Sequence, residues 1–157
     1  MTTTEILSIE FESIKKDLIA RHNQLKMKAS GNWEKSLEVD IIGSNDLAIA
    51  RIYAEHYTEQ LVYGRKPGKF PPIKAIEQWI IDKGISTIGK NIKISSLAFL
   101  IARKIAKEGT KYYKDGGTDL VSSVVTAERI QSIIDKVREI NLTYITKGLV
   151  EQLKAVA

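Results

Sequence analysis

Two histidines and a pair of glutamates are the side chains best suited to acid-base or metal chemistry. His22 and His56 lie 34 residues apart, and no carboxylate spacing around them matches a metal site or a catalytic triad. We interpret both as surface or packed side chains. Glu55 and Glu59 share one face in a helix or in a strand, which suits general acid-base work. Because no polar cluster accompanies them, solvent exposure is the better interpretation, and no enzymatic activity is predicted.

The sequence also lacks phosphate-binding motifs and cysteine. The segment Gly64-Arg65-Lys66-Pro67-Gly68-Lys69 lacks the Ser or Thr that follows the lysine of a P-loop, and there is no GxGxxG pattern. The chain has no cysteine, which excludes disulfides, thiolate metal sites and cysteine nucleophiles. We therefore expect neither a cofactor nor a bound metal.

Positive charge gathers in the middle of the chain. Residues 65–115 carry 12 Lys and Arg against 4 Asp and Glu, whereas residues 1–64 carry 7 against 10. A basic segment of this kind meets nucleic acid, an acidic face of a partner, or water. Three aromatic side chains within it can stack on bases, although Trp79 lies on an apolar helix stripe and fits core packing better. These three are Trp79, Tyr112 and Tyr113.

The N-terminal third predicts a helix followed by strands. Thr3 or Thr4 can cap a helix that runs to about Met27, with Leu7, Phe11, Ile14, Leu18 and Leu25 along one stripe. Residues 37–41 alternate as a half-buried strand does, and 43–46 predict a turn. Residues 47–63 predict one or two strands, but 47–56 also fit a helical face, so that both types stay open.

Glycine and proline delimit the elements of the middle third. Residues 64–69 predict a loop, and Pro71-Pro72 lead into a helix of about 73–83 that Gly84 ends. We expect Ile76, Trp79 and Ile80 to face inward. A second helix is expected from Ser95 or Ser96 to Gly109, burying Leu97, Leu100 or Ile101, and Ile105.

The last third predicts a connector and a long helix. Residues 111–118 indicate a mobile connector or hairpin tip, and residues 120–125 a short strand. Thr126 can cap a final helix, which Gly148 bends or ends. Unbroken to Val156, that helix would be ~46 Å long, more than a small domain needs for its own core. No stretch is apolar and long enough to span a membrane.

Together these elements predict the α+β class: a small antiparallel sheet packed with helices, with long N-terminal and C-terminal helices. The composition, 43% hydrophobic and 27% charged in 157 residues, fits one domain over residues 1–157. The C-terminal helix, about 126–156, is a possible extension of that domain.

One stretch carries a family resemblance. The run from Tyr63 to Pro72 is followed by Trp79, then Lys83-Gly84, and later Gly109-Thr110. This pattern is similar to that of phage tail-completion and head-tail joining proteins, also described as neck or minor tail proteins. In that family a Gly-Arg-rich loop ends in proline, a helix carries Trp before Lys-Gly, and a second helix closes on Gly-Thr.

The resemblance implies a structural subunit of the virion neck that assembles in the host cytoplasm. It implies a homo-oligomeric ring, a hexamer or dodecamer, that joins the portal or connector to tail proteins, with genomic DNA passing through its channel. We expect the loop to be the subunit interface, with Phe70 as its anchor. The expected interface residues are Tyr63, Gly64, Arg65, Lys66, Pro67, Gly68, Lys69, Phe70, Pro71 and Pro72.

The alternative is a nucleic-acid-binding module that uses the basic segment 65–115. Its two expected helices would resemble a helix-turn-helix, but the connection of about eleven residues is too long for the short turn of that motif. A small hydrolase using Glu55 and Glu59 is a further alternative, supported only by their spacing.

Overall fold

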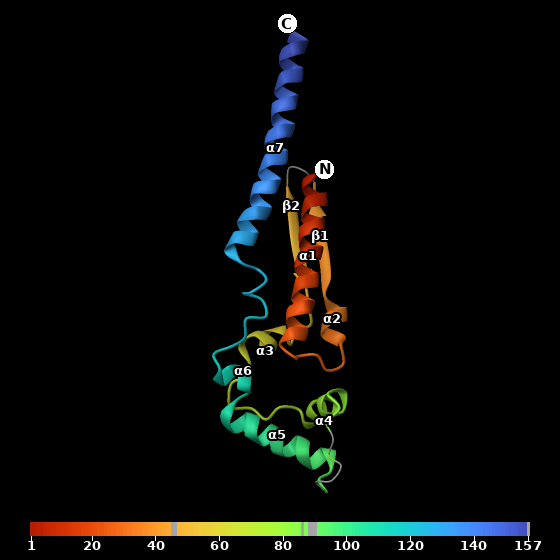
Figure 1. Cartoon of the computed structure of the whole chain (residues 1–157), viewed down its shortest axis with the longest axis vertical. Coiled ribbons are helices and arrows are strands. Elements are labelled where there is room, and N and C mark those ends of the chain that lie inside the picture. Colours follow the sequence, from red (N-terminus) through yellow and green to blue (C-terminus); the bar gives the residue numbers. More distant parts are fainter. Residues whose placement is uncertain (45–46, 86, 88–90, 157) are drawn as a thin grey trace. The chain divides into compact units, whose positions relative to one another are not determined.

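A computed structural model describes residues 1–44, 47–85, 87 and 91–156 (Figure 1). The chain divides into two compact units. The first, unit 1, comprises Met1–Leu18, Leu37–Tyr53 and Ser122–Ala157, and unit 2 comprises Ile19–Ser36 and Ala54–Val121. The predicted α+β class is confirmed: a two-stranded antiparallel sheet accompanies helices, of which the N-terminal and C-terminal ones are long. The single domain stays a prediction.

Unit 1 contains a β-hairpin. Strand β1 (Glu38–Gly43) pairs antiparallel with β2 (Ala48–Tyr53), in a register that runs from Glu38 opposite Tyr53 to Gly43 opposite Ala48. Of the two types left open for residues 47–56, the strand is therefore the correct one. At the predicted turn, the Ser44 N–H donates to the Leu47 carbonyl at 2.9 Å. Asn45 and Asp46 lie outside the described residues.

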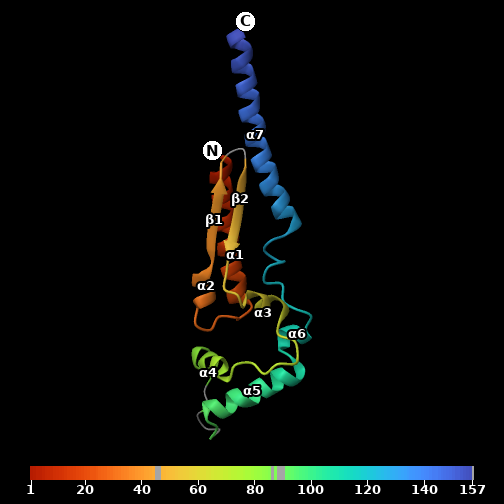
Figure 2. The same ribbon diagram turned by 180° about the vertical axis from the view of Figure 1, so that it is seen from behind.

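Two helices run antiparallel in unit 1 (Figure 2). Helix α1 (Thr3–Gln24) has the predicted extent, and α7 (Ala127–Val156) begins after Thr126, whose hydroxyl accepts from the Arg129 N–H at 3.2 Å. Arg129 pairs with Asp17 at 2.7 Å, and Thr3 donates to Asn141 at 3.3 Å. The two helices are therefore antiparallel: later residues of α7 meet earlier residues of α1. Helix α7 continues through Gly148, so it does not end there.

Unit 2 is built around two helices joined by their apolar faces. Helix α4 (Ile73–Asp82) and α5 (Ile94–Glu108) bury Ile76, Ile80, Ala98 and Ala102 in one cluster. Around this cluster pack Ile73, Ile94, Leu97, Ile101 and Ile105. As predicted, Gly84 and Gly109 have positive φ and follow the two helices. The short helices α2 (Asn32–Ser36), α3 (Thr58–Tyr63) and α6 (Lys111–Lys114) complete the unit.

Several expectations for unit 2 and its flank are wrong. Residues 58–63 form a helix and not a strand, because alternation over six residues also fits one and a half helical turns. Trp79 is 42% exposed, since Ile76 and Ile80 fill the contact with α5 and turn the indole to the rim. Of the two alternatives Leu100 and Ile101, the second is correct, because Ile101 packs against the cluster while Leu100 is exposed. Residues 120–125 are turns without a strand, and 111–114 are helical.

A buried aromatic pair that the sequence did not predict lies in unit 2. Trp33 is 3% exposed and its indole N–H donates to the Thr58 hydroxyl at 2.8 Å. His22 stacks on it with ring centroids 4.4 Å apart, and the His22 Nδ1 lies 3.4 Å from a Glu34 carboxylate oxygen. Of the two histidines, His22 is therefore packed and His56 is on the surface.

Candidate functional site

The predicted interface loop, Tyr63–Pro72, connects α3 to α4 in unit 2. Helix α3 ends where Gly64 takes a φ of +75°, a conformation that side-chain-bearing residues rarely adopt. Pro72, with φ −60°, precedes the first turn of α4, and Pro71 is buried. The loop therefore begins and ends at fixed points.

A reciprocal pair of hydrogen bonds fastens the loop to the segment that follows α5. The Arg65 N–H donates to the Thr110 hydroxyl, and the Thr110 N–H donates to the Arg65 carbonyl, both at 2.9 Å. Further along, the Gly68 N–H donates to the Ala106 carbonyl at 2.9 Å. We call this set of bonds the Arg65–Thr110 clamp. It satisfies backbone groups that a free loop would leave to water.

The clamp depends on two glycines that permit close backbone approach. A Cβ on Gly64 would lie 2.2 Å from the Tyr113 nitrogen, and one on Gly109 would lie 2.8 Å from the Arg65 carbonyl oxygen. Both distances are shorter than the closest approach that a Cβ makes to a non-bonded nitrogen or oxygen atom. The Gly-Thr of the resemblance thus has a physical role here, since Gly109 makes room for the loop and Thr110 holds it.

Side chains of the clamped loop face outward. Tyr63 is 66% exposed and Phe70 is 47% exposed. The Phe70 ring lies 5.7 Å from that of Phe99 on α5, which is equally exposed, so the two rings form a small apolar patch. Lys66 and Lys69 are exposed as well. Within the described part of the chain, neither lysine forms an ion pair.

An open hollow of about 950 Å³ lies along the loop. Its walls are formed by two tyrosine side chains, three lysine or arginine side chains, one glutamate side chain and the backbone of the loop. They are formed by Glu59, Gln60, Tyr63, Gly64, Arg65, Lys66, Pro67, Gly68, Lys69, Tyr113 and Gly116. This composition favours contact with an acidic or aromatic surface of another macromolecule.

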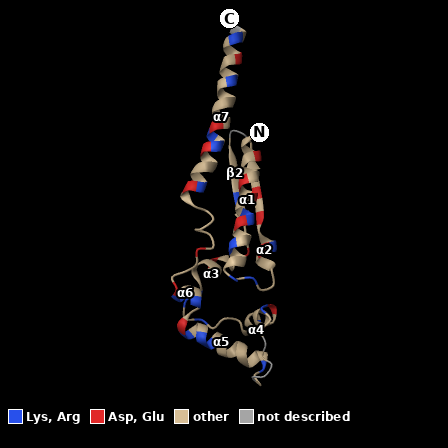
Figure 3. Ribbon diagram, in the orientation of Figure 1, with Lys and Arg blue, Asp and Glu red and all other residues tan. Residues whose placement is uncertain are grey.

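Positive charge continues from the loop onto α5 and α6 (Figure 3). Helix α5 carries three exposed cations, Arg103, Lys104 and Lys107. On α6, Lys114 is paired with Glu108 at 3.3 Å. Of the aromatic residues considered for base stacking, Tyr113 lines the hollow, whereas Tyr112 is partly buried, and this burial raises the pKa of its phenol.

The histidines and glutamates singled out in the sequence do not form a metal-binding cluster among the described residues. No cluster of three or more His, Asp or Glu side chains occurs there. Glu55 lies before α3 and pairs with the exposed His56 at 3.6 Å, and Glu59 lies in the first turn of α3. The structure thus does not bring either histidine to the hollow.

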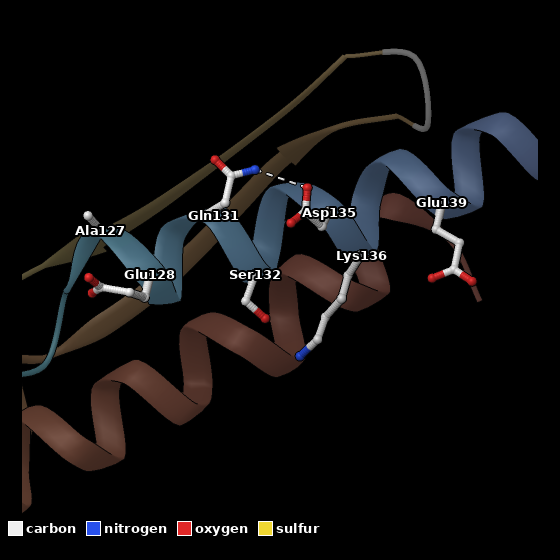
Figure 4. Close-up of a pocket in the computed structure, with 7 residues that line it drawn as sticks. All are labelled: Ala127, Glu128, Gln131, Ser132, Asp135, Lys136 and Glu139. Atoms are coloured by element: carbon white, nitrogen blue, oxygen red, sulfur yellow. Dashed lines mark hydrogen bonds between the residues drawn. The ribbon is translucent and has the colours of Figure 1, made fainter.

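A second hollow lies on α7 in unit 1 and has a structural explanation. Figure 4 shows Lys136 extending toward α1, where it pairs with Glu10, and Gln131 donating to Asp135 at 2.9 Å. The lining is a helix surface of ordinary charged and polar side chains. Because Lys136 is paired with Glu10 and Asp135 with Arg138 at 3.2 Å, we assign it no binding role.

Comparisons of the chain with protein-family models, with curated proteins and with solved structures find no match. No described helix has the length and apolar character needed to cross a membrane. The site residues that sequence reasoning missed are Phe99 and Ala106, whereas Tyr113 was considered only for base stacking and Thr110 only as part of the family pattern. Nothing in the sequence indicated the contact of Thr110 with Arg65.

Proposed function

We propose that this chain is a structural subunit of a phage neck ring, joining the portal or connector to the tail, and that Tyr63–Pro72 is its subunit interface. The observation that carries the proposal is the Arg65–Thr110 clamp: a proline-bracketed loop is held on helices while its aromatic and cationic side chains remain exposed. A loop ordered before binding loses little entropy when it docks, so more of the contact energy appears as affinity.

The charge distribution supports contact between copies. In a cyclic ring each subunit presents two different patches to its two neighbours. The basic segment 65–115 on one copy can therefore face the acid-rich segment 1–64 of the next. Phe70 and Phe99 would supply the apolar anchor of such a contact. No catalytic step is part of this function.

Location in the virion tests the proposal directly. Particles that carry a labelled copy of the chain should show the label at the head-tail junction by electron microscopy. Label on the capsid shell, along the tail or at its distal end would overturn the proposal, and so would particles that lack the chain altogether.

A photo-crosslinking residue at position 66 tests the interface. In assembled necks, the Lys66 variant should crosslink to a neighbouring polypeptide in high yield. The same residue at position 78, which lies on α4 in the same unit and away from the loop, is the matched control. Equal yields at the two positions would contradict the assignment of the loop as an interface.

The cations on α5 favour a second candidate, a nucleic-acid-binding surface over 65–115. Helices α4 and α5 are not a helix-turn-helix, because Asp82 and Ile94 bound a long connection. Binding would therefore be to phosphates and steeply salt-dependent. Duplex affinity that falls at least about tenfold between 50 and 200 mM salt, and is lost in Arg103→Glu/Lys107→Glu, would favour this candidate.

A further inference from the structure

The β-hairpin of unit 1 has two open edges. Among the described residues its sheet consists of β1 and β2, and no backbone hydrogen bond joins either strand to another element. Each strand of an antiparallel pair turns half of its N–H and C=O groups toward its partner and half outward. The outward groups form a row along each edge. Such a row binds an extended segment, because that segment offers the complementary groups at the same spacing.

The turn of the hairpin indicates which groups face outward. Ser44 and Leu47 bond across it, since the Ser44 N–H donates to the Leu47 carbonyl. Bonded and non-bonded pairs alternate along an antiparallel ladder, so Ile42 and Ile49 form the next bonded pair. The residues between the bonded pairs direct their N–H and C=O groups outward: Val39 and Ile41 on β1, and Ala50 and Ile52 on β2.

The outer face of the hairpin carries apolar side chains without a cover. Helix α1 lies over one face, and no described helix lies over the opposite one (Figure 2). Ile42 and Ile49 stand opposite each other and are 49% and 43% exposed. Asp40 stands opposite Arg51, whose guanidinium donates to the Tyr53 hydroxyl at 3.3 Å. A third strand beside the hairpin would pack its side chains against this row.

Charge indicates which strand fits each edge. On the outer face β1 carries Glu38 and Asp40, whereas β2 carries Arg51. Two β1 edges side by side would bring carboxylates together, and two β2 edges would bring guanidinium groups together, both unfavourable. A β2 edge beside a β1 edge instead places Arg51 next to a carboxylate. The occupant that fits each edge is therefore the other edge of a second copy of this chain.

We propose that the hairpins of neighbouring copies join edge to edge, with β2 of one copy beside β1 of the next. Copies around a ring axis point the same way, so β2 meets the next β1 antiparallel and the sheet continues from copy to copy. Ile49 then lies opposite Ile42 of the next copy, and Arg51 opposite Asp40. The antiparallel direction rests on the proposed ring, whereas the pairing of unlike edges follows from the hairpin itself.

Single cysteines in the full chain test this register, because the chain has no native cysteine. Under mild oxidation, a mixture of Ile42→Cys and Ile49→Cys copies should form disulfide-linked dimers at least about fivefold more efficiently than either variant alone, since facing Cβ atoms in a sheet are close. Tyr53→Cys is the matched control, on the same face of β2 but about 13 Å further along.

Three results of the cysteine experiment would overturn the proposal. Dimers of Ile42→Cys alone in equal yield would indicate that like edges meet. A preference of Ile42→Cys for Tyr53→Cys would indicate parallel strands. Equal yields in all mixtures, or no dimers, would indicate that the edges do not pair.

An exchange of charges separates contact between copies from contact within one hairpin. Asp40→Arg and Arg51→Glu should each lose self-association in sedimentation of the full chain, because each places like charges at every contact between copies. In an equal mixture of the two variants, every such contact joins opposite charges again, although neither hairpin is repaired. Association should therefore return in the mixture.

Self-association retained in either single variant, or absent from a mixture of folded variants, would contradict the proposal. Circular dichroism checks that the variants fold, and the cysteine experiment, which leaves the charges in place, decides the question if one does not. Virion location reports only on the neck role, so the two proposals can fail separately.

Discussion

At the scale of single residues, Gly64 has the least freedom to change. Gly64→Ala combines a φ of +75° with a Cβ 2.2 Å from the Tyr113 nitrogen, so the loop must leave α6 to accept it. We expect a loss of at least about 2 kcal/mol in the free energy of unfolding, measured by denaturant titration. Gly116 also has a positive φ, +82°, but a Cβ there would meet open space, so Gly116→Ala should lower the free energy of unfolding by clearly less. Equal costs would contradict the close approach.

His22 makes stability depend on pH. Burial of the imidazole, assisted by Lys83 and Lys28 and opposed by Glu34, holds the pKa of His22 below its ordinary value. Below about pH 6.5 the unfolded chain therefore binds more protons than the folded one. Stability should be complete above that pH and fall as pH decreases, by at most about 1.4 kcal/mol per pH unit from this group.

Thermal unfolding between pH 7.5 and 5.5 measures this effect. His22→Gln cannot titrate, so its melting temperature should decline less than that of the wild type as the pH falls. His56→Gln is the matched control, because His56 is 91% exposed. Parallel declines for the wild type and His22→Gln would contradict the role of His22. Glu34 does not interfere in this range, since its pKa is below its ordinary value.

At the scale of elements, Gly148 weakens the second half of α7. It lies inside the helix with open space where a Cβ would stand, and among the described residues no hydrogen bond or ion pair joins the helix to α1 beyond Asn141. Gly148→Ala should stabilise the helix by about 1 kcal/mol. Hydrogen exchange should slow about fivefold over 142–156 and stay unchanged over 127–137. Unchanged exchange throughout would contradict the view that Gly148 limits the stability of this half.

The elements that sequence patterns predicted are those with long periodicity or clear punctuation. The stripes of α1 and α7 and the glycines after α4 and α5 sufficed for these helices. Helix α3 was mistaken for a strand because six residues cannot separate a period of two from one of 3.6. Trp79 shows a second limitation of sequence patterns. It lies on an apolar stripe and yet is exposed, because Ile76 and Ile80 occupy the contact with α5.

The candidate site was predictable as a loop but not as a rigid one. Glycine and proline indicate where the chain turns, and they correctly placed a loop at 64–69, before the helix that follows Pro71-Pro72. Its attachment joins Arg65 to Thr110, 45 residues later. Local propensity carries no information about such contacts, and the pairing of His22 with Trp33 was missed for the same reason.

At the scale of the whole molecule, uneven charge predicts that association depends on salt. If basic 65–115 meets acid-rich 1–64 of a neighbour, assembly should slow about tenfold between 50 and 300 mM salt. Lys66→Glu/Lys69→Glu should flatten this dependence, whereas Lys147→Glu/Lys154→Glu, on α7, should not. Light scattering during assembly measures the rate. Salt-independent assembly of the wild type would indicate that charge does not guide the contact.

The clamp also determines how the chain meets a protease. Arg65 and Lys66 look like a prime target for trypsin, yet the Arg65 carbonyl is engaged by the Thr110 N–H and Lys66 is followed by proline. Cleavage requires a strand-like segment that has come free of its neighbours, and this one must first part from Thr110 and Ala106. Trypsin should therefore cut at Lys154, in the exposed end of α7, well before it cuts at Arg65. Cleavage after Arg65 should therefore be a late event, although two cations stand side by side at this point of the exposed loop.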